Sequence, residues 1–205
     1  MLIAKDWLKS DGESMRDIVA SEGKLVAGSF QTRECSLFAE HYASLQRDTG
    51  RAVPPRKAFD PSRARTLLPY LSILEIKEPK LALVRLVGTA IVNRTRIDNT
   101  GRNLLDMLPE QSRDWSWGHF KRITETPCGS TFLSKEDYEH VSLWIEVVSF
   151  PLADVEGAAR YILSLSVEVD RQQLAFRGSQ AMQIGELSSY RYIDIGCGIG
   201  RPAER

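Results

Sequence analysis

Apolar residues along the chain recur with two spacings, one typical of helices and the other of strands. From Phe30 to Gln46 they return every three or four positions, which predicts an amphipathic helix that ends before Gly50. Asp60 and Pro61 are typical of residues that open a helix, so a second, short helix is predicted there. A longer helix is predicted over residues 113–126.

Five stretches rich in leucine, isoleucine and valine predict strands. Two of them, 70–76 and 80–87, flank the turn Lys77-Glu78-Pro79 and are typical of a β-hairpin. The other three are 130–133, 141–150 and 159–169. In the last stretch apolar and polar side chains alternate, which predicts one covered and one more solvated face of the sheet.

Together these elements predict an α+β fold. We expect a five-stranded antiparallel sheet with short helices on one face and an N-terminal amphipathic helix. This domain is expected to span residues 29–175. Residues 1–28 are predicted to form a loosely ordered tail with a short helix around Met15 to Ala20, and residues 176–205 a second tail.

The composition is that of an ordinary globular protein, with 42% hydrophobic and 26% charged residues. The 27 basic and 27 acidic side chains balance, which argues against nucleic-acid binding. No stretch resembles a signal peptide or approaches the ~20 apolar residues of a membrane span, so a cytoplasmic location without membrane insertion is expected. Cys35, Cys128 and Cys197 have no zinc-type spacing, and no metal site is expected.

A glycine-rich string, Asp194-Ile195-Gly196-Cys197-Gly198-Ile199-Gly200, resembles the first motif of S-adenosylmethionine-dependent methyltransferases. That motif needs a helix after the glycines and a parallel sheet beyond it. Only residues 201–205 follow, so a flexible tail explains the string better than a cofactor site does. No spacing typical of a catalytic serine, a P-loop or a metalloprotease occurs in the chain.

A second string, Gly101-Arg102-Asn103-Leu104-Leu105, resembles the flavin-binding motif of light-sensing LOV domains, Gly-x-Asn-Cys-Arg-Phe. In those domains the cysteine forms the covalent adduct with the flavin. Leu104 stands at the cysteine position and has no thiol. LOV photochemistry is therefore excluded, while binding of a flavin in the dark stays open.

The order of the elements and several local strings resemble PAS domains, and in particular a bacterial subfamily of short proteins with a single PAS domain. The strings are Val53-Pro54-Pro55-Arg56, Phe59-Asp60-Pro61, Leu68-Pro69-Tyr70-Leu71-Ser72-Ile73-Leu74-Glu75, Val84-Arg85-Leu86-Val87-Gly88-Thr89 and Asp98-Asn99-Thr100-Gly101. The resemblance implies the PAS fold, in which a sheet and short helices enclose a pocket, and a sensory or docking role. It leaves the cofactor unknown, because PAS pockets hold haem, flavin, small acids or nothing.

Candidate pocket residues come from the longer helix and the last strands. His119 lies beside Trp115 and Phe120, and some PAS proteins bind haem through a histidine on the corresponding helix. Plain core packing of these aromatic residues would produce the same pattern, so both interpretations stay open. Trp144 alternates with its apolar neighbours and is also a candidate for an outer face where a partner docks. The full set of candidates is Leu104, Trp115, His119, Phe120, Cys128, Trp144, Tyr161 and Leu163.

Three hypotheses about function follow. In the first, a non-enzymatic PAS module binds a small molecule, docks onto a regulatory protein such as a histidine kinase, or does both. No kinase, cyclase or DNA-binding segment is recognised in the chain, so the output is expected to pass through that partner. In the second, the chain is a homodimeric interaction protein with a filled core, whose helix 30–46 packs across the partner. The third is a methyltransferase-like enzyme.

Overall fold

The computed structural model describes residues 30–137, 141–173 and 183–199. The helices are α1 (Arg33–Thr49), α2 (Thr89–Thr95), α3 (Leu104–Met107) and α4 (Glu110–Glu125), and three short 3-10 turns are η2 (Arg56–Ala58), η3 (Pro61–Ala64) and η4 (Leu68–Tyr70). The strands are β1 (Leu71–Lys77), β2 (Leu81–Val87), β3 (Gly129–Asp137), β4 (Val141–Ala153), β5 (Ala159–Gln173) and β6 (Gln183–Ile193). The predicted tail 1–28, with its helix around Met15 to Ala20, lies outside the described residues.

The strands form one sheet in the order β2-β1-β5-β4-β3-β6, and each neighbouring pair is antiparallel. The predicted α+β architecture is therefore confirmed, with the difference that the sheet has six strands rather than five. The sixth strand, β6, lies within the range 176–205 that was expected as a tail. The serines and charged residues of β6 lack the apolar pattern by which a strand is predicted. The strand forms because its backbone groups pair with those of β3.

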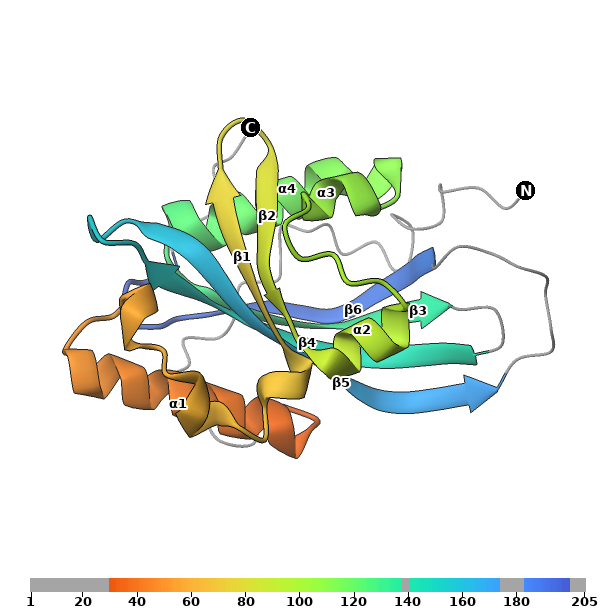
Figure 1. The fold of residues 1–205 in the computed structure, drawn as a ribbon, viewed down its shortest axis with the longest axis horizontal. Coiled ribbons are helices and arrows are strands. Elements are labelled where there is room, and N and C mark those ends of the chain that lie inside the picture. Colours follow the sequence, from red (N-terminus) through yellow and green to blue (C-terminus); the bar gives the residue numbers. More distant parts are fainter. Residues whose placement is uncertain (1–29, 138–140, 174–182, 200–205) are drawn as a thin grey trace.

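Helices cover both faces of the sheet, as Figure 1 shows, with α1 on one side and α3 and α4 on the other. We call the face under α2, α3 and α4 the inner face, and the face under α1 the outer face. Leu163 and Leu165 join the apolar cluster of α1, whereas Ile162 joins the cluster of α4. The more solvated face predicted for this strand is found at Glu168 and Asp170, which are exposed, whereas Ser164 on the same face is buried.

The N-terminal helix begins and ends where its capping residues dictate. The Thr32 hydroxyl accepts a hydrogen bond from the Cys35 amide at 3.2 Å, and Gly50 ends the helix with a φ of 63°. Inside the chain, the Tyr42 ring stacks on Phe150 with 4.3 Å between ring centroids. The helix expected to reach across a partner thus packs on the sheet of its own chain.

Two local predictions are confirmed in detail. The hairpin forms from β1 and β2, with Ile76 opposite Ala82. Asp60 caps η3, because its carboxylate accepts a hydrogen bond from the Ser62 amide at 2.9 Å. Among the described residues, no helix combines the length and the apolar composition that a crossing of a lipid bilayer requires.

Candidate functional site

A row of serines crosses the inner face of the sheet. Ser72 of β1 lies opposite Ser164 of β5, which lies opposite Ser149 of β4, which in turn lies opposite Ser130 of β3. Directly opposed residues of antiparallel strands share a face, and Ser164 follows the inner-face residue Ile162 by two positions. The row is therefore a line of hydroxyl groups on the floor beneath the inner-face helices.

The hydroxyls of this row differ in whether they form hydrogen bonds. Ser149 and Ser164 share a hydrogen bond of 2.8 Å between their Oγ atoms. The Oγ of Ser130 has no hydrogen-bond partner among the described residues, although Ser130 is 0% exposed. A buried hydroxyl without a partner costs roughly 1–3 kcal/mol. The row therefore ends in a group that would gain from a hydrogen-bonding guest.

Apolar side chains border the row on the side of the β1–β2 hairpin. Leu74, Ile76 and Ile162 of the sheet form one cluster with residues of α4. The α4 members of this cluster are Trp117, Phe120 and Ile123. This part of the inner face is a closed apolar core, which agrees with the core-packing interpretation of Phe120.

Aromatic rings surround His119 on the other side of the row. Its ring stacks on Trp115 at 5.4 Å between centroids and meets the edge of Phe132 at 5.9 Å. Its Nδ1 lies 2.7 Å from the hydroxyl oxygen of Tyr190, with which it shares a hydrogen bond. An axial haem ligand needs an open space beside its ring. The His119 ring is 6% exposed and packs closely against these neighbours, which does not fit that role.

Burial sets the charge state of His119. Desolvation lowers the pKa of this imidazole to about 4, so the ring is neutral at pH 7. Burial likewise raises the pKa of the Tyr190 phenol. The pair is therefore uncharged at neutral pH and holds β6 to α4 through one hydrogen bond.

Acidification is expected to destabilise the protein through His119. A histidine in the unfolded chain has a pKa of about 6.5 and is therefore protonated below that pH. In the folded chain His119 is protonated only near pH 4, so proton binding favours the unfolded state between these two values. The free energy of unfolding should therefore fall by about 3 kcal/mol between pH 7 and pH 4 from this residue alone. Urea unfolding across that range measures the loss.

The variant His119→Asn isolates this contribution, because the amide keeps a polar partner near Tyr190 but does not titrate. Its stability should change less with pH than that of the wild type. His41→Asn is the comparison at a half-buried histidine outside the cluster. Burial also lowers the pKa of His41, so this variant should reduce the pH dependence less than His119→Asn does. Identical pH slopes for the wild type and His119→Asn would contradict the assigned charge state.

A nearly buried ion pair holds α2 over the far end of the inner face. Arg94 Nε lies 3.2 Å from a carboxylate oxygen of Glu136 on β3. A second guanidinium nitrogen of Arg94 donates to the Ser166 hydroxyl of β5 at 2.7 Å. A paired and hydrogen-bonded charge is the form in which arginine tolerates burial. These contacts fix the position of α2 relative to two strands of the sheet.

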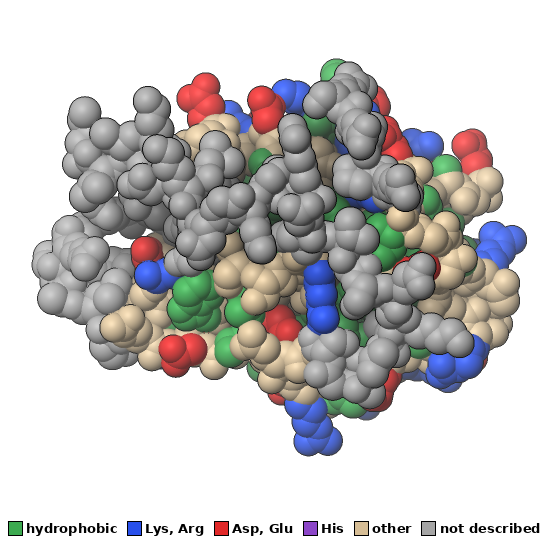
Figure 2. All heavy atoms as spheres, turned by 180° about the vertical axis from the view of Figure 1, so that it is seen from behind, with side chains coloured by type: hydrophobic (Ala, Val, Ile, Leu, Met, Phe, Trp, Pro, Cys, Tyr) green, Lys and Arg blue, Asp and Glu red, His purple; other side chains and the backbone are tan. Residues whose placement is uncertain are grey.

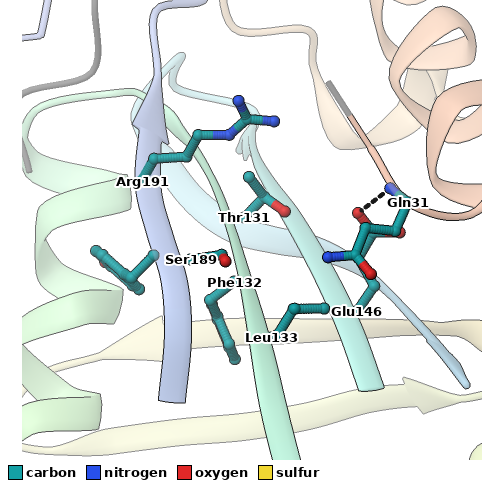
Figure 3. Close-up of a pocket in the computed structure, with 8 residues that line it drawn as sticks. Gln31, Thr131, Phe132, Leu133, Glu146, Ser189 and Arg191 are labelled. Atoms are coloured by element: carbon teal, nitrogen blue, oxygen red, sulfur yellow. Dashed lines mark hydrogen bonds between the residues drawn. The ribbon is translucent and has the colours of Figure 1, made fainter. Parts of the chain in front are cut away.

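A groove of 370 Å³ opens on the outer face, beside the start of α1. Its lining includes Gln31, Thr131, Leu133, Glu146, Ser189 and Arg191. Figure 3 shows Gln31 and Glu146 on one side of the groove and Arg191 on the other. The Glu146 carboxylate accepts hydrogen bonds of 2.8 Å from the amides of Gln31 and Thr32 and from the Thr32 hydroxyl. An anion at this position stabilises a helix N-terminus, so Glu146 anchors α1 to β4.

The eight predicted site residues separate into three groups. Leu104, Trp115, His119 and Phe120 lie on the inner-face helices, and Cys128 follows α4 as a fully buried residue. Tyr161 and Leu163 belong to the apolar cluster of α1, across the sheet from the others. Trp144 lies on β4 between Lys135 and Asp170, in neither apolar cluster. The structure thus brings together only the first group and Cys128 on one side.

Chemical reactivity is limited among the described residues of this region. Burial raises the pKa of the Cys128 thiol to about 11, so it is protonated at neutral pH. The described residues contain no group of three or more histidine, cysteine, aspartate or glutamate side chains arranged to hold a metal ion. The arrangement favours hydrogen bonding and packing over nucleophilic attack.

Sequence reasoning missed Ser130, Tyr190, Tyr192 and the pair of Arg94 with Glu136. The alternating tyrosines at 190 and 192 carry a strand signal, but the neighbouring glycine-rich string directed the interpretation toward a tail. The serine row has no sequence signal, because its members are brought together by register across four strands. Likewise, 42 residues separate Arg94 from Glu136.

Several solved structures resemble this chain in part of their length. A light-oxygen-voltage domain studied with a flavin analogue is 14% identical, with a TM-score of 0.40, covering 53% of this chain and 83% of that chain. An RNA-binding light-oxygen-voltage receptor is 14% identical, with a TM-score of 0.41, covering 57% of this chain and 36% of that chain. A sensory box sensor histidine kinase from Vibrio cholerae is 16% identical, with a TM-score of 0.37, covering 53% of this chain and 94% of that chain.

These structural likenesses say nothing about a ligand or a partner of this chain. No curated protein gives a significant match. A family model described as "PAS domain" matches residues 33–166, which is more than half of the 205 residues and runs from α1 into β5. The chain therefore belongs to the PAS domain family, whose members are sensory and signalling modules.

Proposed function

We propose that this chain is a sensory module that binds a small molecule on its inner face and performs no chemistry of its own. The observation that carries the proposal is the buried Ser130 hydroxyl at the end of the serine row, which finds no hydrogen-bond partner in the described part of the chain. A guest that donates to or accepts from this hydroxyl removes the cost of leaving it unpaired. A guest that reaches this hydroxyl must displace part of the apolar and aromatic packing on either side of the row.

The output of this module passes to a regulatory protein, such as a histidine kinase, in the cytoplasm. Arg94 ties α2 to β3 and β5, and His119 ties α4 to β6, so both helices rest on the strands that carry or adjoin Ser130. A guest that binds one arrangement of these helices better than another shifts the population toward it. The partner then distinguishes the two arrangements.

The glycine-rich string supports the non-enzymatic part of the proposal. A cofactor site would use the backbone amides of the glycines. The amides of Gly196 and Gly198 instead donate to the Asp194 carboxylate, at 2.8 and 3.0 Å. Calorimetry with S-adenosylmethionine should therefore detect no binding, and a binding isotherm would restore the enzyme hypothesis.

A second candidate function is a protein-interaction module with a filled core and no ligand. The close aromatic packing around His119 favours it, because this part of the inner face is occupied by side chains of the chain itself. Both candidates share the PAS fold and differ in whether the inner face holds a guest.

Native mass spectrometry of the purified full chain decides between the two. The sensor proposal expects a mass above that of the polypeptide, which disappears in Ser130→Ala and persists in Ser62→Ala, a control at an exposed serine. An absorption band at wavelengths longer than the ultraviolet absorption of the protein would identify the guest as a haem or a flavin. A wild-type mass equal to that of the polypeptide would favour the filled core, and a guest retained by Ser130→Ala would remove this hydroxyl as the anchor.

A further inference from the structure

Helix α2 and the residues that follow it form a segment, 89–100, that is fixed at its two ends. We call it the α2 segment. Before it, the Gly88 amide donates to the Leu71 carbonyl of β1 at 2.7 Å, and α2 contacts η4 next to this anchor. After it, the Gly101 amide donates to the Val84 carbonyl of β2 at 2.8 Å. Both ends are therefore held by backbone hydrogen bonds to the β1–β2 hairpin.

Between these ends the α2 segment has little apolar packing. Helix α2 contains no buried residue, and none of its residues belongs to either apolar cluster of the described chain. Residues 96–98, which follow the helix, are exposed. Tertiary packing of an apolar face is what holds most helices in place. The α2 segment must therefore be held on the sheet mainly by polar contacts.

The polar contact that reaches the sheet comes from Arg94. Figure 2 shows several lysine and arginine side chains that project outward from the surface. The Arg94 side chain is instead only 11% exposed, and it bonds to Glu136 of β3 and Ser166 of β5. Among the described residues, the other hydrogen bonds made by side chains of the α2 segment stay within the segment. Arg94 is thus the side chain that fastens the segment to the strands.

Both partners of Arg94 lie on the inner face. Ser166 follows Ser164 by two positions in β5, and Glu136 follows Ser130 by six positions in β3, with regular pairing to β4 over both stretches. An even number of positions along a regular strand returns to the same face. Figure 1 shows α2 lying across the strands, apart from α3 and α4. Arg94 therefore holds the α2 segment over the face that carries the serine row.

We propose that the α2 segment is a gate over the inner face, which swings away between its two fixed ends while the sheet stays folded, with Arg94 as its latch. Opening returns the charges of Arg94 and Glu136 to water, which offsets part of the lost attraction between them. With little apolar area to expose, this opening costs much less free energy than unfolding of the whole domain. The inference rests on the proposed function only for the guest that the gate admits, because the opening itself needs no guest.

The test is native-state hydrogen exchange of the full chain, read at amides 92–96 of α2 and at the amides of β1 and β5. In the wild type the α2 amides should exchange faster than those of the two strands. Arg94→Gln should accelerate exchange in α2 by roughly tenfold or more, because a hydrogen-bonded charge pair is lost, and leave the strands nearly unchanged. Arg94→Lys keeps the charge but loses the planar fork that reaches two partners, so it should accelerate α2 less.

A matched control removes a comparable ion pair elsewhere. Arg85 lies 2.6 Å from the nearly buried carboxylate of Glu75 on the hairpin, and Arg85→Gln should leave exchange in α2 unchanged. The double variant Arg94→Gln/Glu136→Gln tests the pairing, because exchange in α2 should be no faster than in Arg94→Gln alone.

Two results would overturn the gate. One is exchange in α2 that Arg94→Gln and Arg94→Lys leave unaltered. The other is equal acceleration in α2, β1 and β5, which would mean that Arg94 stabilises the whole domain rather than this segment. Native mass spectrometry without a guest would contradict the sensor proposal and leave these exchange rates as they are, so the two proposals fail separately.

Discussion

Gly88→Ala is expected to destabilise the protein by roughly 4 kcal/mol or more, which few single substitutions reach. Gly88 joins the end of β2 to α2, and its φ of −73° is available to any residue. The obstacle is space, because an added Cβ would lie well under 3.0 Å from the carbonyl oxygens of Leu68 and Pro69. These are backbone atoms, and the Gly88 amide is held by the Leu71 carbonyl at 2.7 Å.

Gly118→Ala is the matched control, and urea unfolding of both variants is the measurement. Gly118 lies exposed on α4, and an added Cβ meets nothing within 4 Å. Alanine there should stabilise the protein by up to about 1 kcal/mol, because glycine weakens a helix interior. If Gly88→Ala unfolded at the wild-type urea concentration, the close approach of η4 to this turn would be disproved.

Phe120→Ala is expected to cost about 3 to 5 kcal/mol of the free energy of unfolding. The Phe120 side chain is 9% exposed and packs in the apolar cluster between α4 and the sheet, together with Trp117 and Ile123. Truncation to alanine removes most of the ring and leaves a cavity that the surrounding strands cannot fill. Thermal and urea unfolding of the variant measure this cost.

Lys121→Ala is the control on the adjacent residue of the same helix. Lys121 forms ion pairs with Glu78 and Glu125, whose side chains are exposed, and ion pairs in water contribute little to stability. Phe120→Ala should therefore lower the free energy of unfolding several times more than Lys121→Ala does. A small loss from Phe120→Ala would mean that this helix face does not pack on the sheet.

The local elements were predictable because their signals lie within a few residues of one another. A capping residue such as Asp60 forms its hydrogen bond within the adjacent turn. The strands β1 and β2 pair with each other and are neighbours in the sequence, so their pattern lies within one short segment. The prediction erred at β6, where Ser188, Ser189 and Arg191 lack the apolar signal of a strand. This strand depends on the backbone groups at the edge of β3, which no local pattern reveals.

The candidate site was predictable only in part, because the sequence of a single strand does not show which of its residues lie on the same face of the sheet as residues of other strands. Leu163 and Phe120 both read as apolar residues suited to a pocket, yet the sheet separates them. Ser130 reads as an ordinary strand serine. Its importance comes from Ser149 opposite it and from its buried Oγ, which lacks a hydrogen-bond partner within residues 30–137, 141–173 and 183–199.

The sequence by itself determined the α+β class, the family and the positions of α1, the hairpin and the long helix, because periodicity, caps and turns act over short distances. Only the tertiary structure decided which residues share a face and which hydroxyls line up across four strands. These features arise from strand register and from packing on both faces of the sheet. Both join residues far apart in the chain, and neither leaves a periodic pattern in it.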